Sequence, residues 1–205
     1  MKVFGLTGGI AAGKSEVASR LRAAGIPVID ADAVAREQAR RGGAAYDGIV
    51  AEFGPSVLGP EGDIDRAALA AVAMPDPGRR ARLEALTHGA VIGEVGRRLA
   101  VLAEMGHRVA VVEAPLLVET GLHEGLDGLV VVTAGANVRL GRAVARGGVT
   151  EADAAARIAA QASDERRLAA ATEVIVNDGT IEDLARRAIA LAVRLGAKGS
   201  QWPKS

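Results

Sequence analysis

The segment Gly8–Ser15 carries the residues whose chemical purpose is clearest. It reads Gly-Gly-Ile-Ala-Ala-Gly-Lys-Ser and fits the pattern G-x-x-x-x-G-K-[ST], in which glycines let backbone N–H groups converge on phosphate oxygens. The lysine is expected to reach the β- and γ-phosphates, and the serine hydroxyl to bind Mg²⁺. Lys14 is also the only lysine between Lys2 and Lys198 in a chain that otherwise uses arginine. We therefore predict a nucleotide-binding loop formed by Gly9, Ile10, Ala11, Ala12, Gly13, Lys14 and Ser15.

Acidic residues follow two of the short apolar runs that we expect to be strands. Asp30 and Asp32 follow Val28–Ile29, and Glu113 follows Val109–Val112. Ligands of open α/β sheets bind beyond the carboxyl ends of the strands, so these carboxylates are expected near the phosphate loop. A carboxylate at Asp30 or Asp32 can accept a proton from an attacking hydroxyl group or cap the helix that follows, and the periodicity gives the two interpretations equal weight. Glu113 is expected to hold the metal through water, and a surface glutamate is the alternative.

Arginines and further charges cluster later in the chain. Arg139, Arg142 and Arg146 have the spacing i, i+3, i+7 and share one face of an expected helix. Guanidinium groups pair bidentately with phosphate, so this face can neutralise a phosphoryl group in transfer; surface salt bridges are the alternative. The run from Ser163 to Arg167 predicts the start of another helix with exposed charges.

The elements that position these residues follow from hydrophobic patterning. Five short runs predict strands: Val3–Leu6, Val28–Ile29, Val109–Val112, Leu129–Thr133 and Val174–Val176. Because these runs are continuously apolar, we expect strands buried on both faces, as in a parallel sheet covered by helices. Helical patterns lie between the runs, for example over Glu16–Ala24 and after an N-cap at Thr180. The alternation predicts a doubly wound α/β fold.

Two regions interrupt this alternation. Residues 33–106 contain no convincing strand but several helices, one of them opened by Asp65, and are predicted to form a helical insertion between the second and third strands. Residues 138–171 are helical and rich in arginine, with an N-cap expected at Thr150; they are predicted to form a lid, and a solvated helical surface is the alternative. The remaining predictions are a nucleotide-binding core formed by residues 1–32, 107–137 and 172–197, and a disordered tail at 198–205.

Composition excludes several other classes of protein. The 205 residues carry 25 basic and 25 acidic side chains, and this zero net charge argues against a general nucleic-acid or acidic-membrane binder. The absence of cysteine excludes disulfides and cysteine–zinc sites. No uncharged apolar run approaches the roughly 18 residues that span a bilayer. A signal peptide over the first residues is the weaker interpretation because glycines and Lys14 interrupt the apolar run, so we expect a cytoplasmic protein.

Several motifs, in order, resemble those of the dephospho-coenzyme A kinase family over about residues 2–195. The first of them are the phosphate loop preceded by Leu6-Thr7, and Asp30-Ala31-Asp32 followed by Ala35-Arg36. The later ones are Phe53-Gly54, Gly62-x-Ile64-Asp65-Arg66-x-x-Leu69, Leu86-x-His88, Pro115-Leu116-Leu117-x-Glu119, Arg157-Ile158-x-x-Gln161 and Asn177-Asp178-Gly179.

The resemblance implies an enzyme that moves the γ-phosphoryl group of ATP to the ribose 3′-hydroxyl of dephospho-coenzyme A, with Mg²⁺. It implies an α/β P-loop kinase core with a five-stranded parallel sheet, a helical acceptor-binding insertion and a helical lid. By position, Asp32 becomes the catalytic base, and Lys14 and Arg142 stabilise charge. The acceptor side is assigned to Arg36, Arg66, His88 and Pro115, and further nucleotide contacts to Arg146, Asn177 and Gly179. Nucleic-acid and membrane partners are not expected.

The chain departs from the family pattern at a few positions. Ala11-Ala12 stands where Gly-Ser is more usual, and Gly89 follows His88 where proline is usual. The alternatives that remain are another P-loop nucleoside monophosphate or small-metabolite kinase, and a P-loop switch protein. Against the switch protein, the sequence has no Asn-Lys-x-Asp guanine-reading motif.

Overall fold

The computed structural model describes residues 1–148, 150–161 and 163–196, and its chain forms two compact units. The sheet unit consists of Met1–Ile29 together with the chain from Leu102 onward, and the helical unit is Asp30–Val101. The domain boundaries drawn from the sequence stay predictions, and the predicted tail at 198–205 lies outside the described residues.

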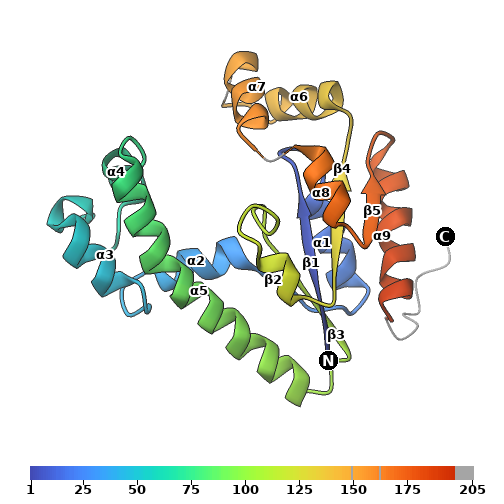
Figure 1. Ribbon diagram of the computed structural model, residues 1–205, viewed down its shortest axis with the longest axis horizontal. Helices are drawn as coiled ribbons and strands as arrows, with labels where there is room; N and C mark the ends of the chain where they lie inside the picture. The colour runs from blue at the N-terminus through green and yellow to red at the C-terminus, as the bar shows by residue number, and fades with distance from the viewer. Residues whose placement is uncertain (149, 162, 197–205) are drawn as a thin grey trace. The chain divides into compact units, whose positions relative to one another are not determined.

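The sheet has five strands in the order β2-β3-β1-β4-β5 (Figure 1). They are β1 (Lys2–Gly8), β2 (Val28–Asp30), β3 (Val109–Glu113), β4 (Gly128–Thr133) and β5 (Glu173–Val176). β1 pairs in parallel with β3 and β4, and β4 pairs in parallel with β5. Every residue of β3 is buried, as expected for a parallel strand covered on both faces. The five predicted strands and the α/β class are therefore confirmed, and each strand extends a residue or more beyond its apolar run.

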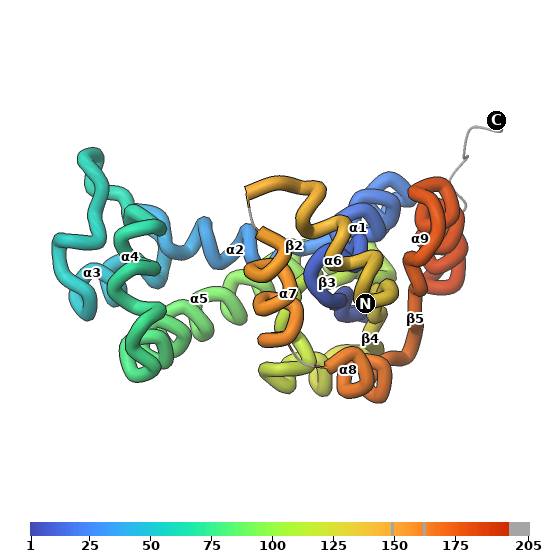
Figure 2. Tube along the Cα trace, turned by 90° about the horizontal axis from the view of Figure 1, so that it is seen from above, coloured from blue at the N-terminus to red at the C-terminus, as the bar shows by residue number. Residues whose placement is uncertain are grey.

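Helices cover both faces of the sheet. On one face α1 (Lys14–Ala23) packs beside α9 (Ile181–Leu195) over a core that includes Leu6, Leu21, Val111, Val130 and Leu191. On the other face α8 (Asp164–Ala170) contacts β4, near a second cluster formed by Leu117, Val118, Leu129 and Val131. Figure 2 shows α1 and α8 on opposite sides of β4. Each fully buried leucine or valine contributes about 1.5–3 kcal/mol, so aliphatic packing supplies most of the stability of this core, with the partly buried Phe4 packed against it.

The sheet unit also contains η2 (Leu122–Gly125), α6 (Ala136–Ala145) and α7 (Glu151–Ala159). Thr150 and Thr180 form capping boxes at the first residues of α7 and α9, so both N-cap predictions are confirmed.

The helical unit contains α2 (Ala31–Gln38), α3 (Tyr46–Phe53), η1 (Pro55–Val57), α4 (Arg66–Ala73) and most of α5 (Pro77–Glu104). Asp65 caps α4 as predicted, because its carboxylate accepts hydrogen bonds from the N–H groups of Ala67 and Ala68. A core of Ala45, Ile49, Phe53, Val57, Leu69 and Ala73 joins α3, η1 and α4. No helix in the described parts of the chain is both long enough and apolar enough to cross a bilayer.

Candidate active site

The phosphate loop runs from Gly9 to Ser15 and connects β1 to α1. Two residues of the loop have left-handed backbone conformations, Ala11 with φ of 58° and Gly13 with φ of 103°. Gly13 adopts this conformation without a steric penalty directly before Lys14, the first residue of α1. The first turn of α1, which carries the partial positive charge of a helix N-terminus, therefore adjoins the loop, as an anion site requires.

Lys14 forms an ion pair with Glu113, the acid at the end of β3. The Nζ atom lies 2.9 Å from Oε1, and the two side chains are 17% and 7% exposed. The other carboxylate oxygen lies 3.6 Å from Nη2 of Arg22. Glu113 is therefore buried, and its interpretation as a surface glutamate is wrong. Its role toward a metal stays a prediction.

Asn177 holds the phosphate loop through a hydrogen bond to its backbone. Its side-chain amide donates a hydrogen bond of 2.8 Å to the carbonyl oxygen of Ala12. A side chain at position 13 would collide with this amide, so Gly13 is needed for the close approach as well as for its backbone angle. Arg142 donates hydrogen bonds to the carbonyl oxygens of Asn177 and Gly179, at 2.8 and 3.3 Å. Arg142, Asn177 and Gly179 were assigned to catalysis and nucleotide binding from the sequence. The structure joins them by hydrogen bonds, and Asn177 connects them to Ala12 of the phosphate loop.

Arg139 and Arg167 are buried in ion pairs. Arg139 donates to Oδ2 of Asp164 at 2.8 Å, and Arg167 donates to Oδ1 of Asp164 at 3.2 Å and to Oε1 of Glu119 at 3.0 Å. The prediction that the charges after Ser163 are exposed is wrong for Arg167, whose side chain is 1% exposed. The two carboxylates compensate its charge, which lets the helix that carries it pack against the sheet.

Other residues singled out in the sequence take simpler places. Arg146 follows the last residue of α6 and is exposed. The carbonyl oxygen of Pro115 accepts a hydrogen bond of 3.1 Å from the hydroxyl group of Thr7. Gln161, from the motif Arg-Ile-x-x-Gln, accepts a hydrogen bond of 2.8 Å from the backbone N–H of Ile10 in the phosphate loop.

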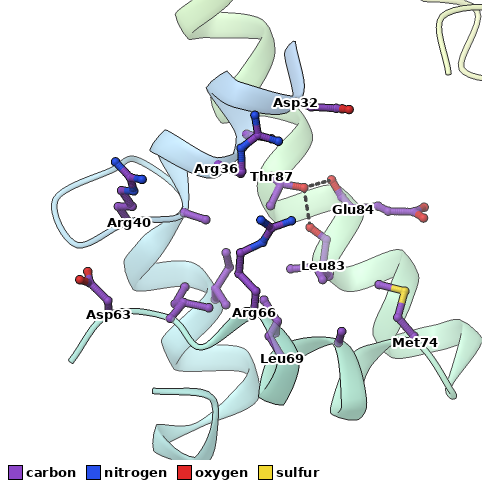
Figure 3. A pocket seen from close by; sticks show the side chains of 15 residues that line it. Asp32, Arg36, Arg40, Asp63, Arg66, Leu69, Met74, Leu83, Glu84 and Thr87 are labelled. Atoms are coloured by element: carbon purple, nitrogen blue, oxygen red, sulfur yellow. Dashed lines mark hydrogen bonds between the residues drawn. The ribbon is translucent and has the colours of Figure 1, made fainter. Parts of the chain in front are cut away.

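The helical unit contains a cavity of about 660 Å³. Figure 3 shows the guanidinium groups of Arg36 and Arg66 extending into it from α2 and α4. Both arginines were predicted on the acceptor side, and Asp32 lines the same cavity. His88 is exposed on α5, next to Thr87, which does line the cavity. The remaining lining residues combine charge with an apolar surface: Arg40, Asp63, Glu84, Ala35, Ala39, Ile49, Ile64, Leu69, Ala70, Met74 and Leu83.

The structure separates the roles of Asp30 and Asp32. Asp30 is the N-cap of α2, where its carboxylate accepts a hydrogen bond of 2.9 Å from the N–H of Ala33. Asp32 lies in the first turn of that helix and is exposed. The capping interpretation is thus confirmed for Asp30, and the role of Asp32 as a base stays a prediction.

Ser15 and Glu113 offer the oxygen donors that suit Mg²⁺. A hydroxyl group and a carboxylate are hard ligands, and Mg²⁺ is usually held by one or two such groups together with the phosphates of a nucleotide. Among the described residues no cluster of three or more His, Asp or Glu side chains is suited to hold a metal ion. A hydroxyl group and a carboxylate are compatible with an ion whose other ligands are nucleotide phosphates and water.

Comparison with known proteins agrees with this assembly of residues. Residues 2–183 match the model of the dephospho-CoA kinase family. The chain belongs to the dephospho-CoA kinase family. The dephospho-CoA kinase of Anaeromyxobacter dehalogenans is 46% identical over 206 residues, covering 100% of this chain and 98% of the relative. The dephospho-CoA kinase of Geobacter sulfurreducens is 44% identical over 187 residues, covering 91% and 95%.

Solved structures agree with the fold. The crystal structure of TT1252 from Thermus thermophilus has a TM-score of 0.82 and 35% identity, and the match covers 95% of this chain and 97% of that one. The dephospho-CoA kinase from Campylobacter jejuni has a TM-score of 0.67 at 23% identity, with the same coverage, and shares the fold.

Three residues close to the phosphate loop were not assigned to a site from the sequence. They are Gln161, Asp164 and Arg167. Gln161 belongs to a motif shared with the dephospho-CoA kinase family, which is a signal that could have marked it. Asp164 and Arg167 carry no comparable signal, because a charged run at a helix start is typical of a solvated surface.

Proposed function

We propose that this chain transfers the γ-phosphoryl group of ATP to the ribose 3′-hydroxyl of dephospho-coenzyme A, giving coenzyme A and ADP. The observation that carries this proposal is the family match over residues 2–183 together with an intact phosphate loop. The 3′-oxygen forms a bond to the γ-phosphorus, and the bond from that phosphorus to the β–γ bridging oxygen breaks. The proton of the hydroxyl group passes to the carboxylate of Asp32.

The chain's own residues supply positioning and charge, which is most of what phosphoryl transfer requires. In this proposal the backbone from Gly9 to Ser15 and the Lys14 ammonium bind the phosphates. Arg142 acts from α6 and Arg146 from the residue directly after that helix, and Asn177 and Gly179 lie at the nucleotide. Mg²⁺, when bound with the nucleotide, would neutralise phosphate charge; the Ser15 hydroxyl group would hold it directly and Glu113 would hold it through water.

The acceptor is proposed to bind in the helical unit. Its cavity of about 660 Å³ combines the arginines Arg36 and Arg66 with an apolar lining, and this suits a ligand that has a diphosphate and a long uncharged arm. Pro115 and His88 are further proposed contacts for the acceptor. We also propose that the enzyme works in the cytoplasm. We expect no nucleic-acid partners, because a chain with zero net charge lacks the surplus of basic residues that binds a phosphate backbone.

The test is the formation of coenzyme A from ATP and dephospho-coenzyme A, followed by chromatography, with AMP, shikimate and gluconate offered as competing acceptors. We expect transfer to dephospho-coenzyme A alone. Phosphorylation of another acceptor in its place would favour a different P-loop small-metabolite kinase. Lys14→Ala should abolish most of the transfer, and unchanged kinetics would contradict the assignment of the phosphate loop.

A further inference from the structure

Two buried arginines lie against the phosphate loop at Gly9. α6 supplies Arg139 and α8 supplies Arg167, and these residues are 6% and 1% exposed. A Cβ atom at Gly9 would collide with Nη1 of Arg139 and would lie 3.6 Å from Nη1 of Arg167. The two guanidinium groups therefore reach the same point of the loop from two different helices. Neither arginine belongs to the group that supports the loop through Asn177.

The charges of this pair are compensated by carboxylates of the chain itself. Asp164 lies between the arginines and accepts a hydrogen bond from each, at 2.8 and 3.2 Å, while Glu119 accepts one from Arg167 at 3.0 Å. Two like charges at nine-tenths burial need such partners, because an unpaired charge in this position costs several kcal/mol.

Each arginine of this pair nevertheless has one nitrogen donor that lacks an acceptor among the described residues. Within the described residues, the Nε atoms of Arg139 and Arg167 are buried and have no hydrogen-bond acceptor. An unmet donor at this depth is unfavourable, and phosphate is the ligand whose several oxygens match the donors of a guanidinium group. A site with two buried cations and unmet donors beside a phosphate-binding loop is therefore suited to a polyanion.

A neighbouring contact follows the same logic. The side-chain oxygen of Gln161 accepts the N–H of Ile10 at 2.8 Å, and this N–H belongs to the loop whose backbone is built to donate to phosphate oxygens. Gln161 and Asp164 lie three positions apart in the sequence. Side-chain oxygens from this short stretch thus meet both a loop N–H group and the two arginines.

We propose that Arg139 and Arg167 bind the phosphate chain of the nucleotide, and that Asp164 is their counter-ion while the nucleotide is absent. The nucleotide's phosphate oxygens take over part of the role of the carboxylate and reach the unmet donors. Asp164 is then a positioning residue, since it holds the arginines at Gly9 without contacting the substrate. This inference rests on the proposed function, because it takes the nucleotide to be a substrate of that transfer.

The first test compares Arg139→Gln and Arg167→Gln with a matched control, Arg166→Gln. Arg166 is the exposed neighbour on α8, and within the described parts of the chain its side chain donates only one long hydrogen bond, of 3.5 Å, to the carbonyl oxygen of Val118. We expect calorimetry to show ATP affinity reduced about tenfold or more in the first two variants and unchanged in the control. The KM for dephospho-coenzyme A should stay near the wild-type value. ATP affinity equal to that of the control would overturn the proposal.

Burial makes folding a concern for these variants, so the conservative changes Arg139→Lys and Arg167→Lys are measured beside them. Lysine keeps the charge but loses the planar fork of donors, so ATP affinity should lie between those of wild type and the glutamine variants. Folded lysine and glutamine variants that all bind ATP as wild type does would show a purely structural pair.

The second test uses Asp164→Asn, with Glu165→Gln as its control. Without the carboxylate the arginines repel each other in the free protein, and bound phosphate relieves this repulsion. We expect a lower thermal midpoint without nucleotide and a larger rise of that midpoint on adding ATP than in wild type or Glu165→Gln. A rise equal to that of wild type would reduce Asp164 to a structural residue and overturn its proposed role.

These tests separate the inference from the proposed function. ATP binding and the ATP-induced thermal shift need no acceptor, whereas the proposed function is judged by coenzyme A formation in the wild-type enzyme. Loss of ATP binding in the arginine variants of an enzyme that makes no coenzyme A would leave the inference standing and remove the proposed function.

Discussion

The Nζ atom of Lys14 lies 2.9 Å from Oε1 of Glu113, so the lysine of the phosphate loop is held by a buried carboxylate at the end of the neighbouring strand. The pair sets the direction of the lysine side chain before any nucleotide binds. Lys14 and Glu113, which the sequence marks as ligands of phosphate and metal, therefore already contact each other in the nucleotide-free protein.

Replacing Glu113 with glutamine should destabilise the protein. The change removes the charge that compensates Lys14, and the two side chains are only 17% and 7% exposed, so we expect a loss of about 1–3 kcal/mol in the free energy of unfolding. Urea denaturation without nucleotide measures it. Glu16→Gln is the control, because the side chains of Glu16 and its partner Arg20 are 28% and 35% exposed, and pairs so open to solvent contribute about 1 kcal/mol or less. Equal effects of the two variants would contradict the expectation.

Asp32→Asn should keep ATP binding and lose turnover. A positioned general base contributes roughly a hundredfold to ten-thousandfold, so kcat should fall within that range while the ATP dissociation constant stays near wild type. Asp30→Asn is the matched control, since asparagine also caps helices and should leave kcat nearly unchanged. Near-normal kcat in Asp32→Asn would remove this residue from the mechanism.

Asn177→Ala should loosen the phosphate loop. The variant leaves the carbonyl oxygen of Ala12 without its buried hydrogen bond of 2.8 Å, which costs about 1–2 kcal/mol, and the KM for ATP should rise several-fold. Thermal unfolding and steady-state kinetics measure the two effects. The exposed Asn137 on α6 provides the comparison as Asn137→Ala, which should change neither quantity.

Gly9→Ala should weaken ATP binding by displacing Arg139. The new Cβ atom collides with Nη1 of that arginine, so either the loop or the guanidinium group must move. The loss should be smaller in the background of Arg139→Gln, where the shorter side chain leaves room, and a double-mutant cycle of ATP dissociation constants measures this coupling. Gly141→Ala on the same helix as Arg139 meets no neighbour within 4 Å and should bind ATP normally. Additive effects of the two changes would speak against the contact.

The acid stability of the helical unit should depend on Glu94. Hydrogen bonds from Arg97 and Arg98 lower the pKa of its carboxyl group from 4.5 to about 2. A carboxyl group with a lowered pKa in the folded state stabilises the protein above its unfolded pKa, and this contribution is lost as the pH falls toward about 2. The difference in urea midpoint between wild type and Glu94→Gln should therefore be full near neutral pH and shrink below about pH 4.5. A difference that is constant over this range would contradict the shift. Glu104→Gln, at the exposed end of the same helix, is the control.

The fold could be predicted from the sequence because its signals are local. A parallel strand covered on both faces is apolar along its length, so runs such as Val109–Val112 mark strands directly. Thr150, Thr180 and Asp65 could be assigned as N-caps because a capping side chain bonds to N–H groups two or three residues away.

The parts of the site that could not be predicted depend on long-range partners. Asn177 bonds to Ala12 across 165 residues, and Arg167 bonds to Glu119 across 48 residues. Nothing in the sequence near Arg167 distinguishes a buried arginine with two carboxylate partners from a solvated one. The spacing of Arg139, Arg142 and Arg146 placed them on one helical face. In the structure Arg139 lies against Gly9 of the loop, Arg142 bonds to Asn177, and Arg146 is exposed.

β1 is the third of five strands in the sheet order, with hydrogen-bonded neighbours on both sides, and it leads directly into the phosphate loop. Core strands of this kind belong to the most slowly opening parts of a fold, so we expect the amide hydrogens of β1 to exchange with deuterium close to the rate of global unfolding. The loop is thus joined to the strand whose amide hydrogens we expect to exchange last, and we expect local opening of the surrounding helices to leave that attachment intact.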